Sequence, residues 1–361
     1  MKFGVCCNPY SPHGWLPPIP TLDSWAALRG LGMTHVRLSA DLNLMASAPS
    51  VMNFGFLDPW TNAITGGGLK IYMNVALCPP WASEDQPAYV GLIPGSAWWN
   101  TPGDASGGIH FFDPDPARNP NHAAVDQAEP ARPYLTAAAT PRISGEFMSW
   151  AAGELAGRYG PIVESWGIWN EPGGDLFYPP IRWDDSNHGG LGDVVATRFM
   201  PEVVVPFMTG LRSVLPNPST VGVEADGDGV LQRCLDIEAQ RDGDFPLFTT
   251  ALSFHPYGDL DGMSYSTTAA FLAVTNERAN GRKLWASEIG GDPQALYDWT
   301  VATVRTHPEI DSIIYLEPRY FFESGSWETN KPVVSAIGRK FSALFNAINK
   351  RGRAVVPPRP T

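Results

Sequence analysis

The chain has 361 residues, of which 43% are hydrophobic, and it contains 13 tryptophans. This is enough apolar sequence for one large core, and a single domain of this size is typical of an α/β barrel. The formal charge of −12 argues against nucleic acid or an anionic membrane surface as the main partner, because both carry the same sign of charge. Gly (36) and Pro (35) are abundant, which predicts long ordered loops.

The cysteines predict neither a disulfide framework nor a metal site. Cys6 and Cys7 are adjacent, while Cys78 and Cys234 stand alone, so we expect buried free thiols. A strand begins at Phe3, and the sequence has no apolar signal segment and no transmembrane run. We therefore expect a cytoplasmic protein, although a secreted protein whose leader has been removed would have the same pattern. The sequence makes no prediction of oligomeric state.

The first part of the chain alternates short apolar strands with helical patterns. Strands are predicted at 3–7, 35–38 and 69–77, and helices begin near residues 21 and 58. The stretch 81–141 breaks the alternation, because it is rich in Pro, Gly, Asn and Asp and has little periodic apolar sequence. A connection of this length inside a domain is typical of a functional loop or lid.

The second part of the chain resumes the alternation. A helix is predicted over 143–159, followed by a strand at 164–169 and by a loop rich in aromatic and acidic residues at 173–192. A helix over 194–215 comes next. The remaining strands are predicted at 220–224, 249–254, 283–288 and 311–316, with helices from about 230, 266, 293 and 333. The tail 351–361 is rich in proline and arginine and is expected to be loose.

Eight strands that are each followed by a helical pattern predict a (β/α)₈ TIM barrel, because this alternation gives a closed parallel sheet. We expect one catalytic domain over 1–350, with long loops after the third and fourth strands and with 81–141 over the active-site face. The carboxyl ends of the strands build the active site of such barrels. The residues of interest at this rim are Arg37, Trp81, Asn170, Glu171, Glu224, His255, Tyr257, Glu288 and Glu317.

Two glutamates on this rim indicate chemistry on a glycosidic bond. Glu171 follows the fourth strand beside Trp169, and Pro172 prevents the strand from continuing. A carboxylic acid that is desolvated by such neighbours holds its proton more firmly, which suits a general acid. Glu288 ends the seventh strand and would face Glu171 across the barrel mouth. One carboxyl group can then protonate the leaving oxygen while the other attacks or stabilises the cationic sugar.

Several motifs resemble those of the retaining glycoside hydrolases of clan A. They are Trp169-Asn170-Glu171-Pro172 on the fourth strand and Ser287-Glu288 on the seventh. His255-Pro256-Tyr257 is similar to the His-x-Tyr of the sixth strand in this clan, and Arg37 to a frequent arginine of the second. Pro79-Pro80-Trp81-Ala82-Ser83 looks most like family 39, which includes β-xylosidases, α-L-iduronidases and bacterial exopolysaccharide hydrolases. Family 5, with cellulases and mannanases, is the next nearest.

The resemblance implies a role for each matching residue. Glu171 would be the acid/base, and Glu288 the nucleophile of a double displacement. Asn170 would bind the sugar 2-hydroxyl, and Tyr257 would donate a hydrogen bond to Glu288 and keep it ionised.

Further residues would bind the substrate or support the site. His255 and Arg37 would hold the sugar or the two glutamates. Aromatic rings on rim loops stack on the apolar faces of sugars, and rim carboxylates bind sugar hydroxyls or stand behind the site in a supporting role. The candidates for these contacts are Trp81, Trp327, Glu224 and Glu317.

The sequence thus predicts a retaining glycoside hydrolase that acts on a polysaccharide or oligosaccharide. It needs no cofactor and no metal, because two carboxyl groups and water suffice. The long loops favour a cleft and internal (endo) cleavage slightly over removal of terminal residues. Two alternatives stay open: a transglycosylase that uses the same residues, and a carbohydrate-binding barrel without catalysis. A serine hydrolase and a nucleotide-binding protein are disfavoured, because the chain lacks their motifs.

Overall fold

The computed structural model describes residues 1–7, 19–76, 82, 144–172, 195–225, 227–240, 249–260, 266–275, 278, 281–327 and 331–353. Trp81, Cys78, the loop at 173–192 and nearly all of the predicted loop 81–141 lie outside these residues. The predictions for those segments therefore stay predictions. The described cysteines, Cys6, Cys7 and Cys234, are buried free thiols, as expected.

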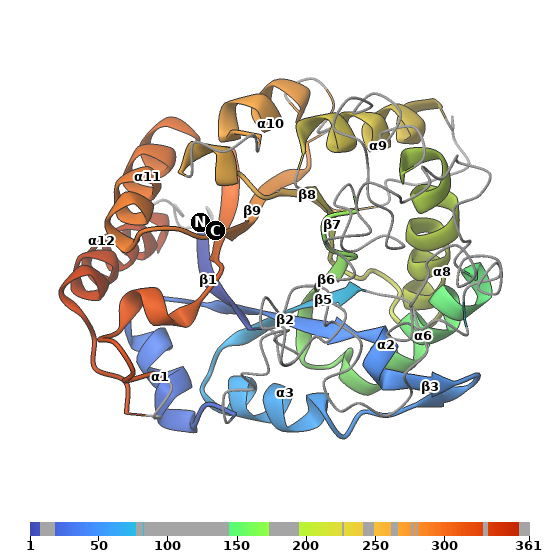
Figure 1. Ribbon diagram of the computed structural model, residues 1–361, viewed down its shortest axis with the longest axis horizontal. Coiled ribbons are helices and arrows are strands. Elements are labelled where there is room, and N and C mark those ends of the chain that lie inside the picture. Colours follow the sequence, from blue (N-terminus) through green and yellow to red (C-terminus); the bar gives the residue numbers. More distant parts are fainter. Residues whose placement is uncertain are drawn as a thin grey trace, which may run out of the picture.

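Eight parallel strands form a closed barrel at the centre of the molecule (Figure 1), which confirms the predicted (β/α)₈ TIM barrel. The order around the barrel is β1, β2, β5, β6, β7, β8, β9 and β10, and β10 pairs with β1 to close it. The strands are β1 (Lys2–Cys7), β2 (His35–Asp41), β5 (Lys70–Ala76), β6 (Val163–Ile168), β7 (Thr220–Ala225), β8 (Ala251–Phe254), β9 (Lys283–Ile289) and β10 (Ile310–Tyr315).

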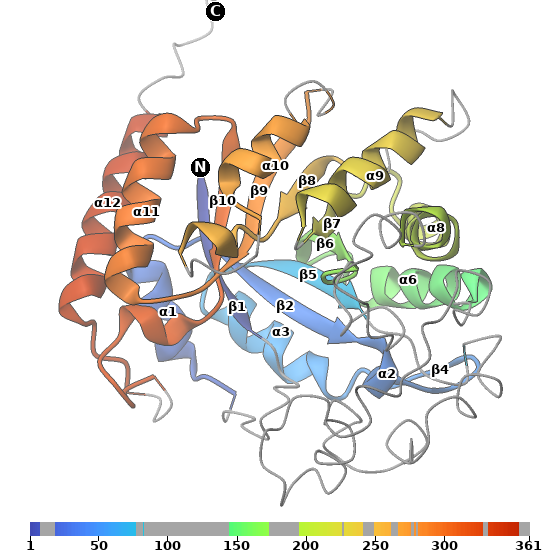
Figure 2. The same cartoon turned by 45° about the horizontal axis from the view of Figure 1, so that its top comes forward.

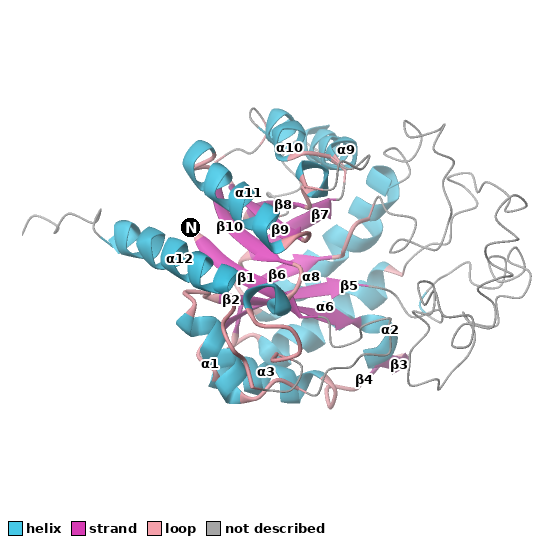
Figure 3. Cartoon of the chain, turned by 60° about the vertical axis from the view of Figure 1, so that its left-hand side comes forward, coloured by secondary structure: helices cyan, strands magenta, loops and turns pink. Residues whose placement is uncertain are grey.

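The helices surround the barrel on its outside (Figure 2). They are α1 (Leu22–Gly30), α3 (Leu57–Gly66), α6 (Gly145–Tyr159), α8 (Val205–Val214), α9 (Asp228–Gln240), α10 (Thr268–Thr275), α11 (Pro293–Thr306) and α12 (Ala336–Arg353). Shorter elements are α2 (Leu42–Met45), the β3 (Ala46–Ala48) and β4 (Val51–Met52) hairpin beyond α2 (Figure 3), the π-helix η7 (Val195–Val204), η8 (Tyr257–Asp259) and η9 (Pro318–Phe321). No described helix has the length and hydropathy of a bilayer-spanning segment.

Side-chain caps explain where several helices begin. The Thr21 hydroxyl accepts a hydrogen bond from the Ser24 amide at 3.3 Å before α1, and Ser144 does the same for Phe147 at 3.2 Å before α6. Asp292 caps α11, whose first residue is Pro293. These caps satisfy amide groups that have no partner inside the helix, so the helices start close to the predicted positions.

Two buried regions hold the barrel together. A large core joins the outward-facing strand residues to the helices. A separate buried cluster contains Tyr72, Val221, Ala251 and Trp285, from β5, β7, β8 and β9. Because neighbouring strand residues point to opposite faces, these four side chains fill the barrel interior. The rings of Tyr72 and Trp285 meet edge to face, with centroids 5.3 Å apart.

An ion cluster lies at the amino-terminal ends of the strands. Glu164 at the start of β6 accepts hydrogen bonds from Lys2 Nζ and His35 Nε2, both at 3.0 Å, and it pairs with Lys70. The hydrogen bond from His35 and those from the two lysines hold the pKa of Glu164 well below its usual range. Residues at this end of a TIM barrel contribute stability, whereas the opposite end carries the chemistry.

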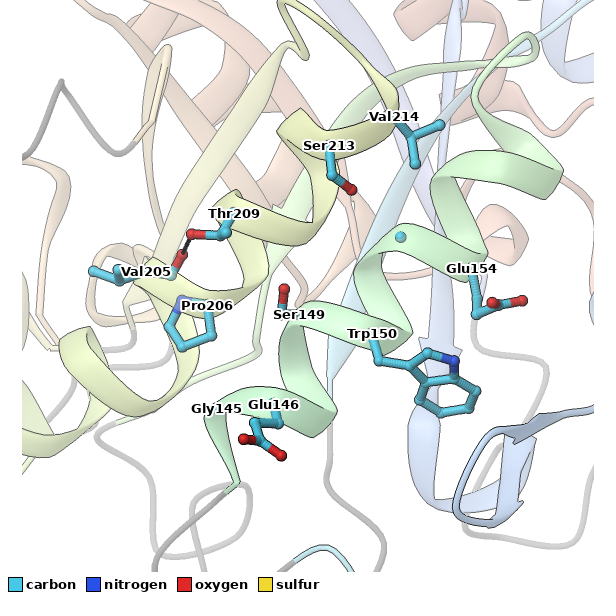
Figure 4. A pocket seen from close by; sticks show the side chains of 11 residues that line it. Gly145, Glu146, Ser149, Trp150, Glu154, Val205, Pro206, Thr209, Ser213 and Val214 are labelled. Carbon is cyan, nitrogen blue, oxygen red and sulfur yellow. Dashed lines mark hydrogen bonds between the residues drawn. The ribbon is translucent and has the colours of Figure 1, made fainter.

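Helices α6 and α8 pack in direct contact (Figure 4), and Gly210 of α8 allows this approach. A Cβ atom at Gly210 would lie 1.9 Å from the carbonyl oxygen of Ser149 in α6. Gly210→Ala should therefore lower the free energy of unfolding by about 1–3 kcal/mol, because the helices must separate. Gly157 of α6 is the matched control, since a Cβ there meets nothing within 4 Å. Gly157→Ala should raise stability by about 0.5–1 kcal/mol through helix propensity. Urea unfolding measures both variants, and equal effects would contradict the prediction.

Candidate active site

Five ionisable side chains meet at the carboxyl end of the barrel. Arg37 lies in β2, Glu171 follows β6, Glu224 lies near the end of β7, His255 follows β8 directly, and Glu288 lies near the end of β9. Hydrogen bonds connect all five in one network. We call these five residues the acid–base cluster. The sequence predicted each of them at this rim.

The backbone is strongly bent where two of the glutamates stand. Glu171 has φ 44° and Glu224 has φ 53°, in the left-handed region that residues with a Cβ rarely adopt. The bends are held by hydrogen bonds: the Glu171 amide donates to the Glu224 carbonyl at 3.0 Å, and the Trp169 amide donates to the Val75 carbonyl at 2.8 Å. Such conformations persist where the surrounding structure enforces them, which is common at functional sites.

Glu288 is held as a carboxylate. The Tyr257 hydroxyl donates to its Oε1 at 2.7 Å, and Arg37 Nη1 donates to its Oε2 at 2.8 Å. Burial raises the pKa of Glu288, but the positive charges of His255 and Arg37 and these two hydrogen bonds outweigh burial, so the pKa lies below its ordinary value. The side chain keeps 14% of its surface exposed, so the carboxylate is accessible from the barrel mouth.

Glu171 faces Glu288 across a short gap. One oxygen of each carboxyl group and one ring nitrogen of His255 all lie within 4.8 Å of one another. The Glu171 side chain is 18% exposed, and its Oε1 lies 2.7 Å from His255 Nδ1. The two glutamates therefore present their carboxyl groups to the same small volume. The three side chains also offer the ligand types that a divalent cation takes, but both nitrogens of His255 are engaged by carboxylates.

His255 bridges two of the glutamates from a fully buried position. Its Nδ1 faces Glu171, and its Nε2 lies 2.9 Å from Glu224 Oε2. Burial lowers the pKa of an imidazole, but the charge of Glu288 and the hydrogen bonds to Glu171 and Glu224 raise the pKa of His255 to about 10. At neutral pH the ring is therefore an imidazolium ion, and both nitrogens donate.

Glu224 and Arg37 lie beneath the two partly exposed glutamates. Glu224 has no exposed surface, and its Oε2 accepts from Arg37 Nη2 at 3.3 Å. Arg37 also donates to Glu288 and to the amide oxygen of Asn170. Both side chains are too deeply buried to touch a sugar. For Glu224 and for Arg37 the sequence leaves open a role in binding the sugar and a role in supporting the two glutamates. Their buried positions support the second role.

Asn170 and Tyr257 hydrogen-bond to members of the acid–base cluster, and two other predicted residues do not. The ring of Trp327 is buried, stacked on Phe322 with centroids 5.3 Å apart and edge to face with Trp25 of α1 at 5.6 Å. It packs between structural elements and is not open to a substrate. Glu317 pairs with Arg319 at 2.8 Å, and no described contact connects it to the acid–base cluster.

Three supporting residues were not among the predicted site residues. The Ser287 hydroxyl donates to Glu224 Oε2 at 2.7 Å, and the Ser253 hydroxyl accepts from the Glu224 amide at 2.7 Å. A serine inside an apolar buried strand needs a partner, and this signal was available in the sequence. Arg37 Nη1 also lies 3.6 Å from Cys6 Sγ. A buried thiol behaves as a small apolar side chain, so the sequence gives no corresponding signal for Cys6.

A hollow lies on the outside of the barrel. It is a groove of about 780 Å³ between α6 and α8 (Figure 4). Its lining residues are Gly145, Glu146, Ser149, Trp150, Gly153, Glu154, Val205, Pro206, Thr209, Ser213 and Val214. None of them belongs to the acid–base cluster, so this groove is separate from the candidate active site.

Comparisons with known proteins identify the fold alone. No family model and no curated protein sequence matches the chain. A β-galactosidase from the psychrophilic Marinomonas ef1 aligns with a TM-score of 0.54 at 13% identity, over 98% of this chain and 60% of its own. A family 30 endoxylanase from Clostridium papyrosolvens C71 aligns with a TM-score of 0.55 at 12% identity, over 97% and 71%. A family 39 glycoside hydrolase from Bacteroides cellulosilyticus WH2 aligns with a TM-score of 0.50 at 15% identity, over 97% and 64%.

Two of these neighbours are named as members of different glycoside hydrolase families, 30 and 39, and align at similar scores. The chain spans about 60% of the length of the Marinomonas β-galactosidase. The comparisons therefore show a (β/α)₈ barrel, and the resemblance to clan A glycoside hydrolases, with family 39 in particular, stays a prediction.

Proposed function

We propose that the protein is a retaining glycoside hydrolase. The observation that carries the proposal is the pair formed by Glu171 and Glu288, two partly exposed carboxyl groups whose nearest oxygens lie within 4.8 Å. Retaining enzymes place their carboxyl groups about 5–5.5 Å apart, whereas inverting enzymes leave about 6.5–9.5 Å for a water molecule. The names of structures with the same fold, a β-galactosidase and an endoxylanase among them, agree with glycosidase chemistry.

Glu288 is the proposed nucleophile. Arg37 and Tyr257 keep it ionised and orient its two oxygens. A carboxylate oxygen attacks the anomeric carbon while the glycosidic C–O bond breaks and Glu171 gives its proton to the leaving oxygen. The product of this step is a glycosyl ester on Glu288. Water then attacks the same carbon, passes a proton to Glu171 and releases the Glu288 carboxylate, so the anomeric configuration is retained.

Asn170 is the proposed contact for the sugar 2-hydroxyl. Its amide oxygen accepts from Arg37, so its amide nitrogen is the group left to donate toward a substrate. This geometry supports a hydrogen bond that strengthens as the sugar becomes cationic in the transition state. Tyr257 would thus act on the reacting centre through Glu288, and Asn170 through the sugar.

We further propose a polysaccharide or oligosaccharide as the substrate, cleaved internally. Digestion of a panel of polysaccharides, with products resolved by size, tests this. A ladder of oligosaccharides indicates endo cleavage, and single sugars or disaccharides indicate removal of terminal units. Proton NMR at early times should show the anomer of the substrate, and the opposite anomer would contradict the retaining mechanism. Longer products in the presence of an acceptor sugar would indicate a transglycosylase, and an unreactive panel would favour a binding protein.

A further inference from the structure

We propose that Glu224 is a positioning residue that holds both catalytic glutamates in their working geometry and sets the number of protons that the acid–base cluster carries. The proposal rests on the proposed function, since it assigns Glu171 and Glu288 to catalysis. It goes beyond that function because Glu224 itself touches neither the substrate nor the reacting atoms. It acts through the residues that it binds.

One oxygen of Glu224 accepts from three donors. Oε2 lies 2.7 Å from Ser287 Oγ, 2.9 Å from His255 Nε2 and 3.3 Å from Arg37 Nη2. His255 extends from this oxygen to Glu171, and Arg37 extends from it to Glu288. A single side chain, His255 or Arg37, therefore connects Glu224 to each catalytic glutamate. A shift of Glu224 would move both partners together.

The backbone of Glu224 is fixed as firmly as its side chain. Its amide donates to Ser253 Oγ at 2.7 Å, and its carbonyl accepts from the Glu171 amide at 3.0 Å. Glu171 is thus anchored to Glu224 through the main chain and, by way of His255, through the side chain. The left-handed φ of 53° at Glu224 is unfavourable for a residue with a Cβ, so these contacts must hold it.

The charges of the cluster balance only with Glu224. When Glu171 carries its proton, the carboxylates of Glu224 and Glu288 oppose the cations of Arg37 and His255. Removing the charge of Glu224 leaves one uncompensated cation in a buried site, where charges are poorly screened. Without the charge of Glu224, the acid–base cluster would therefore release a proton at a lower pH than it does in the unmodified protein. The titratable, charged or polar groups around Glu224 are Cys6, Arg37, Glu171, Ser253, His255, Tyr257, Ser287 and Glu288.

Glu224→Gln removes the charge with little change of shape. Oε2 makes all three described contacts, while Oε1 has no hydrogen-bond partner among the described residues, so the new amide nitrogen can take that place. The variant should lose about tenfold to a hundredfold in kcat/KM, because hydrogen bonds to a neutral amide oxygen hold His255 and Arg37 less firmly than hydrogen bonds to a carboxylate. The basic limb of its pH profile of kcat/KM should move down by about one pH unit or more. A purely structural role would not move this limb.

Two further measurements keep the proposal open to refutation. Glu224→Asp keeps the charge but shortens the side chain, so it should lose rate while the basic limb stays in place. Nitrogen-15 NMR of the His255 ring follows its charge without any substrate, and its titration should move to lower pH in Glu224→Gln only. Glu309→Gln is the matched control, because Glu309 is exposed, pairs with His307 and directly precedes β10, at the end of the barrel opposite the cluster. Its pH profile should equal that of the unmodified protein.

The outcomes separate the two proposals. An active protein whose Glu224→Gln variant is folded and has an unchanged pH profile and an unchanged His255 titration would overturn the role of Glu224 alone. Failure of both Glu224 variants to fold would also overturn it, in favour of a purely structural role. A folded protein that hydrolyses no glycoside would overturn the proposed function, while the His255 titration would still test the charge assignment.

Discussion

Glu288→Ala is expected to lower kcat on an aryl glycoside by about 10³-fold or more, which corresponds to a barrier higher by about 4 kcal/mol. The reason is that the double displacement has no first step without a carboxylate at this position. Arg37 and Tyr257 each lose an acceptor as well, but neither can supply a nucleophile. Steady-state kinetics with a chromogenic aryl glycoside measure the loss.

A small external nucleophile provides the decisive control for this variant. Azide can enter the space left by the Glu288 carboxylate and attack the anomeric carbon directly, which gives a glycosyl azide of inverted configuration. Glu309→Ala removes an exposed glutamate elsewhere and should leave kcat unchanged. Retained turnover in Glu288→Ala, or an azide product with the configuration of the substrate, would remove Glu288 from the nucleophile role.

Glu171→Ala is expected to lose activity in proportion to the need of the leaving group for a proton. On a natural saccharide, whose leaving alcohol is basic, we expect a loss of about 10²–10⁴-fold, the usual contribution of general acid–base catalysis. A dinitrophenyl glycoside needs no proton, so formation of its glycosyl ester on Glu288 should be nearly as fast as before. The ester should then accumulate, because no base activates water. A burst of dinitrophenol before the steady state measures this.

The azide product distinguishes this variant from the previous one. In Glu171→Ala azide attacks the glycosyl ester from the face that water normally uses, so the product keeps the configuration of the substrate. Opposite configurations from the two variants would assign the two glutamates in a single pair of experiments. The same loss on both leaving groups in Glu171→Ala would contradict its role as the acid.

The sequence was sufficient for the fold because the signals for strands are local. Apolar runs such as Lys283–Ile289 end in polar residues where the barrel strands end, so the rim positions of Glu171, His255 and Glu288 followed directly. One helix was predicted over 194–215, but the structure has the π-helix η7, with Pro201 inside it, followed by α8. A proline cannot donate an amide hydrogen bond, and the wider turns of a π-helix are one way to accommodate it. Helix α12 also extends to Arg353, into the start of the predicted tail.

The contacts within the site were less accessible to prediction. A rim position does not say how deep a side chain lies, and the bend at Glu224 places its carboxylate beneath the other two. A loop tryptophan likewise gives no sign of which way its ring faces, so the burial of Trp327 against Trp25 depends on packing between segments distant in sequence. The motifs placed Asn170 directly before Glu171 and Tyr257 two residues after His255, and both side chains hydrogen-bond to members of the acid–base cluster.

The closure of the barrel has a consequence for how the protein reaches its active form. Strand β1 pairs with β10, with Val5 opposite Tyr315, so the first described strand completes its hydrogen bonds only with the last. Contacts between such distant residues form slowly, because a long loop must close before they are gained. Arg37 and Glu288 approach each other across this same seam, between β2 and β9. During refolding, enzymatic activity should therefore return with barrel closure, after the helices have regained their circular dichroism.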